Sequence, residues 1–190
     1  KNITNWANLN GHLNKIEILT FLDNGISLEW LLKSGAKVQN LLTKGSLNHL
    51  KHQIKKTPKE HFSEIEKSIS LAKKQDINTN VYLEDWSNGM KNSKDYVFKY
   101  LDFLTNQEVE RILLPDTLGI ISPNETFSFL SEIIIKYPNT HFDFHAHNDY
   151  DLSVSNVIES LRAGCHGLHL TVNGMGERAG NAPMASVAAV

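Results

Sequence analysis

The sequence predicts an α/β fold built around a parallel sheet, and three features support this. Short apolar runs alternate with amphipathic stretches six times, at spacings of about 25 to 35 residues, as in βα repeats. A polar or glycine-containing cluster follows each apolar run, as expected where the chain leaves a strand. The amphipathic stretches carry apolar residues three and four apart, the spacing of a packed helix face. One such face consists of Val97, Tyr100, Leu101 and Leu104.

Strands and helices are expected to alternate along the chain. The predicted strands span 16–21, 37–42, 80–83, 111–114, 141–147 and 167–172. The predicted helices span 28–33, 46–75 with a break near Thr57-Pro58, 93–105, 123–136, 152–163 and a last one from about Ala182. Ser27 is the predicted N-cap of the first helix, which ends at Gly35. Ser122, Pro123 and Glu125 form the start of a capping-box helix.

The position of the polar clusters distinguishes between two parallel-sheet folds. An open doubly wound sheet gathers its site at one switch point, whereas a (β/α)8 TIM barrel uses all strand ends. Here every predicted strand ends in a polar cluster, which favours the barrel. The clusters are Asp23, Thr43-Lys44, Glu84-Asp85, Asp116-Thr117, His145 to Asp149 and Asn173 to Arg178.

A complete barrel needs about 250 residues and eight βα units. We therefore expect residues 1–190 to be a single catalytic domain that lacks two units, at its amino end. The chain starts without Met and stops inside an apolar run, 184–190. These features suggest a piece of a longer protein.

The composition restricts the class of partner. The chain has 190 residues, 41% of them hydrophobic and 21% charged, and a net charge of −2. This near-neutral balance gives no electrostatic reason to expect nucleic acid or an anionic membrane as partner. No apolar run approaches the roughly 20 residues that span a bilayer. A single cysteine, Cys165, excludes an internal disulfide framework and suits a reducing cytosol. We expect a cytoplasmic protein that acts on small molecules.

The stretch THFDFHAHNDYD, residues 140–151, contains the best candidate metal ligands. His145 and His147 lie two apart in a predicted strand, so both imidazoles project from one face. The following Asn148 and Asp149 indicate a turn, which places the histidines at the carboxyl end of the strand. Two neutral imidazoles begin a divalent-metal site, although an exposed histidine pair is the simpler alternative. Asn181 could add an oxygen or could belong to a turn. Such donors suit Mn²⁺, Mg²⁺, Zn²⁺, Fe²⁺ or Co²⁺.

Two further strand ends carry candidate groups. Tyr82 and Glu84 share one face of their strand, and Glu84 is a candidate general acid or base, or else a solvated carboxylate. Thr117 could bind a substrate carboxylate through its hydroxyl and backbone N–H, or could simply begin a helix-entry turn. The glycine-rich stretch NGMGERAGN, residues 173–181, allows close approach of backbone to a ligand.

Taken together, these stretches resemble the metal-dependent acyl-CoA condensing enzymes that include 2-isopropylmalate, homocitrate and citramalate synthases. The matching motifs are HAHND, NGMGERAGN, LPDTLG and YLEDWSNG. The chain looks closest to the bacterial (R)-citramalate synthases, where NLLTKGS, VYLEDWSNG and LPDTLG occur almost unchanged. The resemblance implies a TIM-barrel domain that condenses acetyl-CoA with an α-keto acid, uses a divalent metal and forms a homodimer.

The resemblance also implies roles for individual residues. His145 and His147 match metal ligands, Asn181 a metal-proximal Asn, Thr117 the residue binding the keto-acid carboxylate, and Glu84 a catalytic acid. Leu19, Leu42 and Tyr82 match the positions that close the pocket around the methyl group of pyruvate. The chain departs from the family pattern at both ends. It lacks the first-strand Arg-Asp-Gly-x-Gln signature and the later segment with the catalytic-base His.

We therefore expect (R)-citramalate formation from pyruvate, in isoleucine biosynthesis, by a longer protein. The alternatives within the family are 2-isopropylmalate synthase, in leucine biosynthesis, homocitrate synthase and a related lyase. A barrel remnant that binds metal without catalysis is the alternative from another class.

Overall fold

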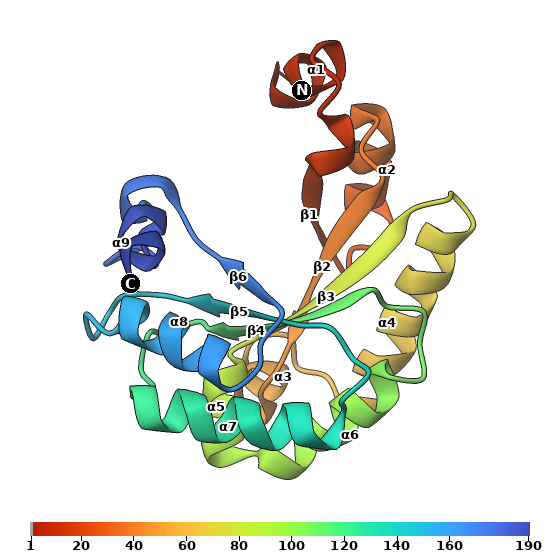
Figure 1. The fold of residues 1–190 in the computed structure, drawn as a ribbon. Coiled ribbons are helices and arrows are strands. Elements are labelled where there is room, and N and C mark those ends of the chain that lie inside the picture. Colours follow the sequence, from red (N-terminus) through yellow and green to blue (C-terminus); the bar gives the residue numbers. More distant parts are fainter. Residues whose placement is uncertain (1) are drawn as a thin grey trace.

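A computed structural model describes residues 2–190 and contains one six-stranded sheet (Figure 1). The strands are β1 (Glu17–Phe21), β2 (Val38–Lys44), β3 (Asn78–Glu84), β4 (Arg111–Asp116), β5 (Phe142–Ala146) and β6 (Gly167–His169). Every neighbouring pair is parallel, and the strand order follows the chain order from β1 to β6. A doubly wound sheet would reverse its strand order at a switch point. The observed order is that of a barrel.

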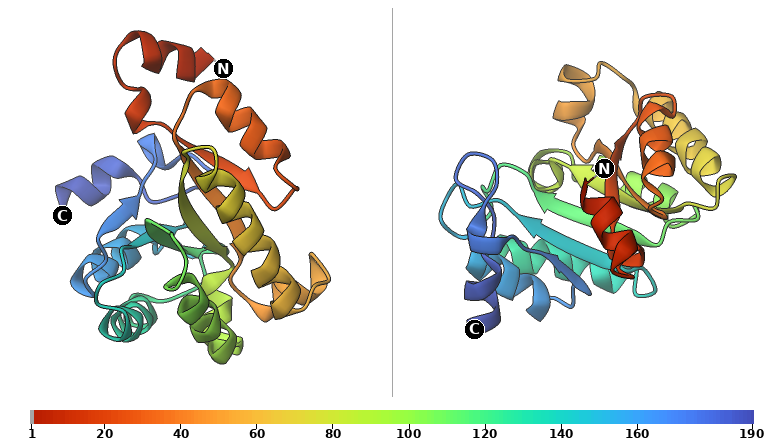
Figure 2. Two further views of the ribbon diagram at one scale, coloured as in Figure 1. Left: turned by 90° about the vertical axis from the view of Figure 1, so that its right-hand side faces the viewer. Right: turned by 90° about the horizontal axis from the view of Figure 1, so that it is seen from above.

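Helices cover the outer face of the curved sheet, while the inner face carries none of the crossover helices (Figures 1 and 2). They are α1 (Asn2–Leu9), α2 (Ile26–Ser34), α3 (Leu47–His52), α4 (Pro58–Lys73), α5 (Trp86–Asn92), α6 (Lys94–Leu104), α7 (Pro123–Lys136), α8 (Ser153–Arg162) and α9 (Met184–Ala189). Two 3-10 turns, η1 (Leu13–Lys15) and η2 (Val172–Gly174), complete the set in the described residues. The prediction of an α/β, TIM-barrel-like fold with six βα units is confirmed, with β1 and β6 as edges.

Most predicted elements are confirmed within a few residues at each end. The break in the long predicted helix is real, because Thr57 and Glu60 form a capping box at the start of α4. The prediction of Ser27 as the N-cap was wrong, since the N-cap is Gly25, at φ 92°, and α2 begins at Ile26, two residues before the predicted start. The Ser27 hydroxyl instead accepts from the Phe21 N–H at 2.9 Å. The carboxylate of Asp23 accepts the Ser27 N–H at 3.0 Å.

The two faces of β3 show how the sequence separates the core from the site. Val81 and Leu83 are fully buried and face the helices. Asn80, Tyr82 and Glu84 alternate with them and point to the interior of the curved sheet. The outer core contains the largest fully buried side chains, among them Trp86, Tyr100, Phe142 and Phe144. The inner face is therefore free to carry polar chemistry.

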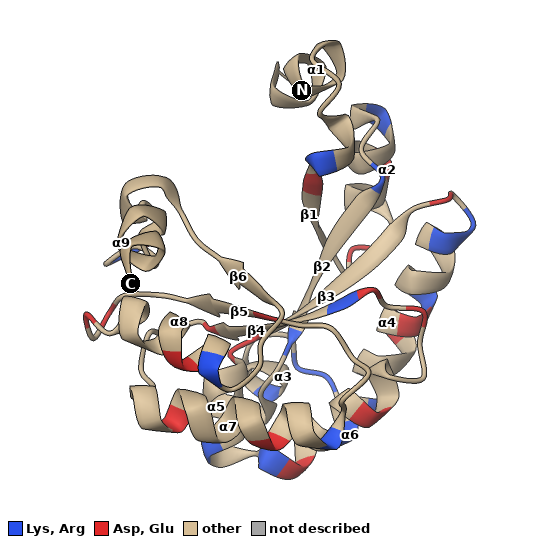
Figure 3. Cartoon of the chain, in the orientation of Figure 1, with Lys and Arg blue, Asp and Glu red and all other residues tan. Residues whose placement is uncertain are grey.

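Charged residues of both signs are interspersed over the outer helices (Figure 3). This distribution agrees with the net charge of −2. Within residues 2–190, no helix has the length and apolar character that crossing a membrane requires.

Candidate functional site

A cavity of about 410 Å³ lies at the carboxyl ends of the strands and brings the predicted site residues together. Its lining consists of Leu19, Leu42, Tyr82, Glu84, Pro115, Thr117, His145, His147, Glu177 and Arg178. All the predicted site residues except Asn181 are in this set. Their convergence from widely separated stretches follows from parallel strands whose carboxyl ends meet at one side of the sheet.

His145 and His147 lie side by side in this cavity. Their Nε2 atoms are 3.3 Å apart, and both Nδ1 atoms are buried without a hydrogen-bond partner. Burial lowers the pKa of His145 to about 3, with help from the neighbouring imidazoles of His147 and His169. Burial also lowers the pKa of His147. Both rings are therefore neutral near pH 7, the form in which imidazole binds a metal.

The backbone of Asn181 pairs with that of His147, because the chain after β6 folds back beside the end of β5. An isolated antiparallel bridge joins His147 to Asn181. The Asn181 Nδ2 donates to the Met175 carbonyl at 3.1 Å, which leaves its Oδ1 buried without a partner. Gly176 is required here, because a Cβ at that position would overlap the Asn181 amide.

The donor set of His145, His147 and Asn181 fits a divalent ion. Two nitrogens that bind one ion at about 2.1 Å are separated by roughly 3.0–3.4 Å, which matches the observed pair. The unpartnered Asn181 oxygen is a hard donor of the kind that Mg²⁺ and Mn²⁺ prefer. Between residues 2 and 190 there is no cluster of three or more His, Cys, Asp and Glu that could hold a metal. These three residues would supply only part of the coordination shell of such an ion.

Arg178 connects the turns that follow three strands. It donates to both carboxylate oxygens of Asp149, at 2.7 and 2.8 Å, and to the Thr117 carbonyl at 2.8 Å. The hydrogen bond from Arg178 lowers the pKa of Asp149. The sequence indicated only a glycine-rich loop here. The pairing itself had no local signal, because its partners are 29 residues apart.

Replacing Arg178 with alanine is expected to loosen the loop 173–181 without unfolding the barrel. Charge-assisted hydrogen bonds are worth about 1 kcal/mol or more at a partly exposed site, so amide exchange should accelerate about fivefold to tenfold. Hydrogen–deuterium exchange of peptides from this loop measures the change. Arg162→Ala is the matched control, because Arg162 forms a surface pair with Glu159 at 2.7 Å. Equal exchange in both variants would contradict the cross-linking role of Arg178.

Glu84 has neighbours that the sequence did not indicate. Lys44 forms an ion pair with its carboxylate, and the two residues are register partners on β2 and β3. The Nδ1 of His49 is 3.7 Å from the Glu84 Oε1, and its Nε2 is 3.5 Å from an oxygen of the buried Asp85. The Glu84 side chain is 20% exposed, at the cavity. Glu84 therefore lies within a small group of ionisable side chains.

Thr117 has a structural contact besides its place in the cavity. Its Oγ1 accepts the Asp85 N–H at 2.8 Å, which ties the end of β4 to the end of β3. An accepting hydroxyl keeps its own hydrogen for donation. Thr117 can thus hold the turn and still donate to a ligand oxygen.

Leu19, Leu42 and Tyr82 form an apolar wall on one side of the cavity. Leu42 and Tyr82 are register partners in neighbouring strands, which brings their side chains together. Leu19 is 47% exposed, because it lies on the edge strand β1. Burial raises the pKa of Tyr82, so its hydroxyl stays protonated. This hydroxyl is hydrogen-bonded to the Nδ1 of His169.

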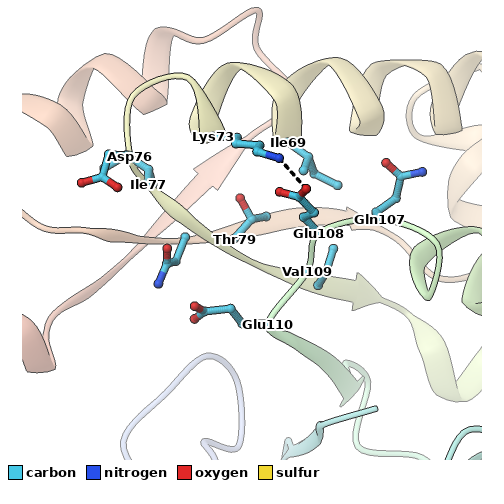
Figure 4. Close-up of a pocket in the computed structure, with 10 residues that line it drawn as sticks. Ile69, Lys73, Asp76, Ile77, Thr79, Gln107, Glu108, Val109 and Glu110 are labelled. Carbon is cyan, nitrogen blue, oxygen red and sulfur yellow. Dashed lines mark hydrogen bonds and ion pairs between the residues drawn. The ribbon is translucent and has the colours of Figure 1, made fainter. Parts of the chain in front are cut away.

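A second cavity, of about 360 Å³, opens at the opposite ends of the strands (Figure 4). It lies between α4 and the start of β4, beside the Lys73–Glu108 ion pair. It shares no lining residue with the first cavity. In βα barrels this end serves stability rather than chemistry.

Comparison with known proteins gives the family. The HMGL-like family model matches residues 27–190. A homocitrate synthase of Sulfurisphaera tokodaii is 34% identical over 141 residues, which are 74% of this chain and 30% of the relative. The homocitrate synthase of Saccharolobus solfataricus is 33% identical over 141 residues, which are again 74% of this chain and 30% of the relative. The matched part of the chain is thus less than a third of these relatives.

Solved structures agree on the fold. An HMG-CoA lyase of Bacillus subtilis superposes with a TM-score of 0.79 at 19% identity, over 90% of this chain and 60% of the lyase. The hydroxymethylglutaryl-CoA lyase of Pseudomonas aeruginosa superposes with a TM-score of 0.78 at 18% identity, again over 90% of this chain and 60% of the lyase. At such identities the likeness concerns the fold alone. Since the family model matches residues 27–190, which is most of its length, the chain belongs to the HMGL-like family.

Proposed function

We propose that the protein carrying this chain condenses acetyl-CoA with an α-keto acid, and that the keto acid is pyruvate. The products would be (R)-citramalate and CoA. The observation that carries the proposal is the cavity, which combines a histidine pair, a carboxylate, a hydroxyl and an apolar wall. Family membership and the homocitrate synthase relatives support this reaction class. A homodimer stays a prediction from the resemblance.

The keto acid would bind between the histidine pair and Thr117. His145, His147 and Asn181 would hold a divalent ion, with further donors from outside this chain. When bound there, the ion would act as a Lewis acid on the keto-acid carbonyl. The Thr117 hydroxyl would donate to the substrate carboxylate, because its lone pair already accepts the Asp85 N–H.

Glu84 would assist the proton transfer that completes the condensation. A base that we place outside this chain removes a proton from the acetyl methyl group, and the resulting enolate carbon attacks the ketone carbon. Glu84 would assist the transfer of a proton to the new alkoxide oxygen, as one of a group with Lys44 and His49 that can carry that proton. Water then hydrolyses the citramalyl thioester to citramalate and CoA.

The lining of the cavity favours a small, singly charged keto acid. Arg178 is the only Lys or Arg among the described lining residues, and Asp149 already neutralises it. The second carboxylate of 2-oxoglutarate would lack a free cation, and burying an unpaired charge is costly. In this proposal Leu42 and Tyr82 would crowd the isopropyl group of 2-oxoisovalerate, and each excess methylene is worth about 1–3 kcal/mol.

Homocitrate synthesis is the second candidate, because the relatives with that name are 34% identical to the chain. 2-Isopropylmalate synthesis is a third within the same reaction class. A barrel that binds metal without catalysis is the alternative of another class.

A thiol-release assay on the complete gene product that includes this chain tests the proposal. Acetyl-CoA is supplied with pyruvate, 2-oxoisovalerate or 2-oxoglutarate, with and without EDTA. We expect CoA release with pyruvate that EDTA abolishes and Mn²⁺ restores. Faster release with 2-oxoglutarate or 2-oxoisovalerate would overturn the choice of pyruvate. No release with any keto acid would favour the non-catalytic barrel.

Metal content provides the control for the assay. His145→Ala and His147→Ala are each expected to lose bound metal after gel filtration, as measured by elemental analysis. His52→Ala is the matched control, because that exposed histidine lies at the end of α3, away from the cavity. Equal metal content in all three variants would place the ion elsewhere.

A further inference from the structure

A connected series of polar side chains crosses the interior of the curved sheet below the cavity. Glu17 on β1 forms an ion pair with Arg111 on β4, and Arg111 Nη1 donates to the Oδ2 of Asp143 on β5 at 2.8 Å. The same carboxylate oxygen is 3.1 Å from the Nε2 of His169 on β6. The Nδ1 of His169 is hydrogen-bonded to the Tyr82 hydroxyl on β3. Tyr82 is thus joined to four other strands.

The local packing is arranged around Asp143. Its side chain is 1% exposed, and its register partner on β6 is Gly167. A Cβ at Gly167 would lie 2.6 Å from the Asp143 carboxyl carbon, so no larger residue leaves room for this carboxylate. His169 follows two residues later on the same face of β6. The glycine therefore allows the carboxylate to reach the imidazole.

The chemistry of these groups sets the direction of each hydrogen bond. Burial alone would raise the pKa of Asp143, but the hydrogen bond from His169 and the charge of Arg111 bring it below its ordinary value. An ionised carboxylate only accepts, so the Nε2 of His169 carries the proton that it donates to Asp143. In the tautomer protonated on Nε2 alone, Nδ1 has a free lone pair and accepts from the Tyr82 hydroxyl.

We propose that His169 is a positioning residue: held by Asp143, it fixes the Tyr82 ring in the apolar wall and so limits the size of the keto acid. The proposal rests on the proposed function of the cavity. Tyr82 forms this wall together with Leu19 and Leu42, and an aromatic ring without its hydroxyl bond can tilt. His169 supplies that bond from β6, which is separated from β3 by the two strands β4 and β5.

Selectivity between pyruvate and 2-oxobutanoate, which is one methylene longer, tests the proposal in the complete gene product. His169→Leu removes the acceptor, and Tyr82→Phe removes the donor. Each is expected to lower the ratio of kcat/KM for pyruvate over 2-oxobutanoate about tenfold, mainly through KM. The double variant, with both substitutions, should lose no more of this selectivity than either single variant, because each substitution breaks the same hydrogen bond. His169→Asn keeps an acceptor near the Nδ1 position and should recover most of the selectivity.

His141→Asn is the matched control. His141 also contacts Asp143, at 2.9 Å, but it is not joined to Tyr82. Its selectivity should equal that of the wild type. Two outcomes overturn the proposal: wild-type selectivity in His169→Leu, or an equal loss for both keto acids that His169→Asn does not recover.

Nitrogen-15 NMR of histidine-labelled protein separates this inference from the proposed function. In the wild type we expect the His169 Nδ1 signal of an unprotonated, hydrogen-bonded acceptor, and Tyr82→Phe should shift it. Absence of that shift while condensation activity is intact overturns the inference alone. The shift together with no condensation by the wild type overturns the proposed function, and with it the selectivity role of His169.

Discussion

Replacing Glu84 with glutamine is expected to lower kcat about 10²- to 10⁴-fold while the KM for the keto acid changes little. Glutamine keeps the shape of the side chain but can neither accept nor pass on a proton, and positioned acid–base groups contribute rate enhancements of this size. The keto acid should still bind, because its proposed contacts come from Thr117 and the histidine pair. Steady-state kinetics on the complete gene product measure both constants.

The matched control for this variant is Glu64→Gln. Glu64 also pairs with a lysine, Lys56, at 2.5 Å, but it does not line the cavity. Its kcat should equal that of the wild type. An unchanged kcat in Glu84→Gln would remove Glu84 from the mechanism. A rise in KM with an unchanged kcat would instead make it a binding residue.

Replacing Gly89 with alanine is expected to destabilise the fold by about 3 kcal/mol or more. Gly89 lies in α5, where an added Cβ would overlap the Gly45 carbonyl oxygen and lie 2.8 Å from Val97 Cγ2. The Gly45 backbone has no space to move away, because it packs against the backbone of Leu83: a Cβ added at Gly45 would lie 2.5 Å from the Leu83 carbonyl oxygen. Three stretches of backbone meet here without an intervening side chain. Urea unfolding of the complete gene product measures the loss.

Gly35→Ala is the comparison for Gly89→Ala. Gly35 ends α2 with φ 80°, so alanine there is strained by roughly 1–2 kcal/mol. Its added Cβ would meet only the Leu13 Cδ2, at 3.4 Å. A loss in Gly89→Ala no greater than in Gly35→Ala would show that α5 shifts easily. In that case the ends of β2 and β3 are not packed as tightly as the structure indicates.

The local patterns of the sequence were sufficient for most of the fold. Alternating apolar runs identified all six strands, and the capping box at Ser122 fixed the start of α7. Helix α5 was missed because Gly89 and its asparagine neighbours are typical of a loop. The tight contact with Gly45 requires that glycine, and this contact is formed only in the folded chain. Long-range packing therefore overrides local propensity at this point.

The candidate site was predictable to the extent that it lies at strand ends. His145, Glu84 and Thr117 follow or end apolar strands, and the barrel brings such positions together. Their partners were not predictable. His49 and His169 approach Glu84 and Tyr82 from other elements, through contacts between residues 35 and 87 apart in the chain. Neither hydrophobic periodicity nor a short sequence motif can predict a contact between residues so far apart in the chain.

The edge strand β1 has a consequence for handling the 190-residue chain by itself. One side of β1 has no neighbouring strand among the described residues, and its Leu19 and Phe21 are 47% and 43% exposed. An uncovered strand edge with apolar side chains is a template for another chain. Heterologous expression of these residues alone would therefore favour self-association, and solubility would depend on strands that cover this edge.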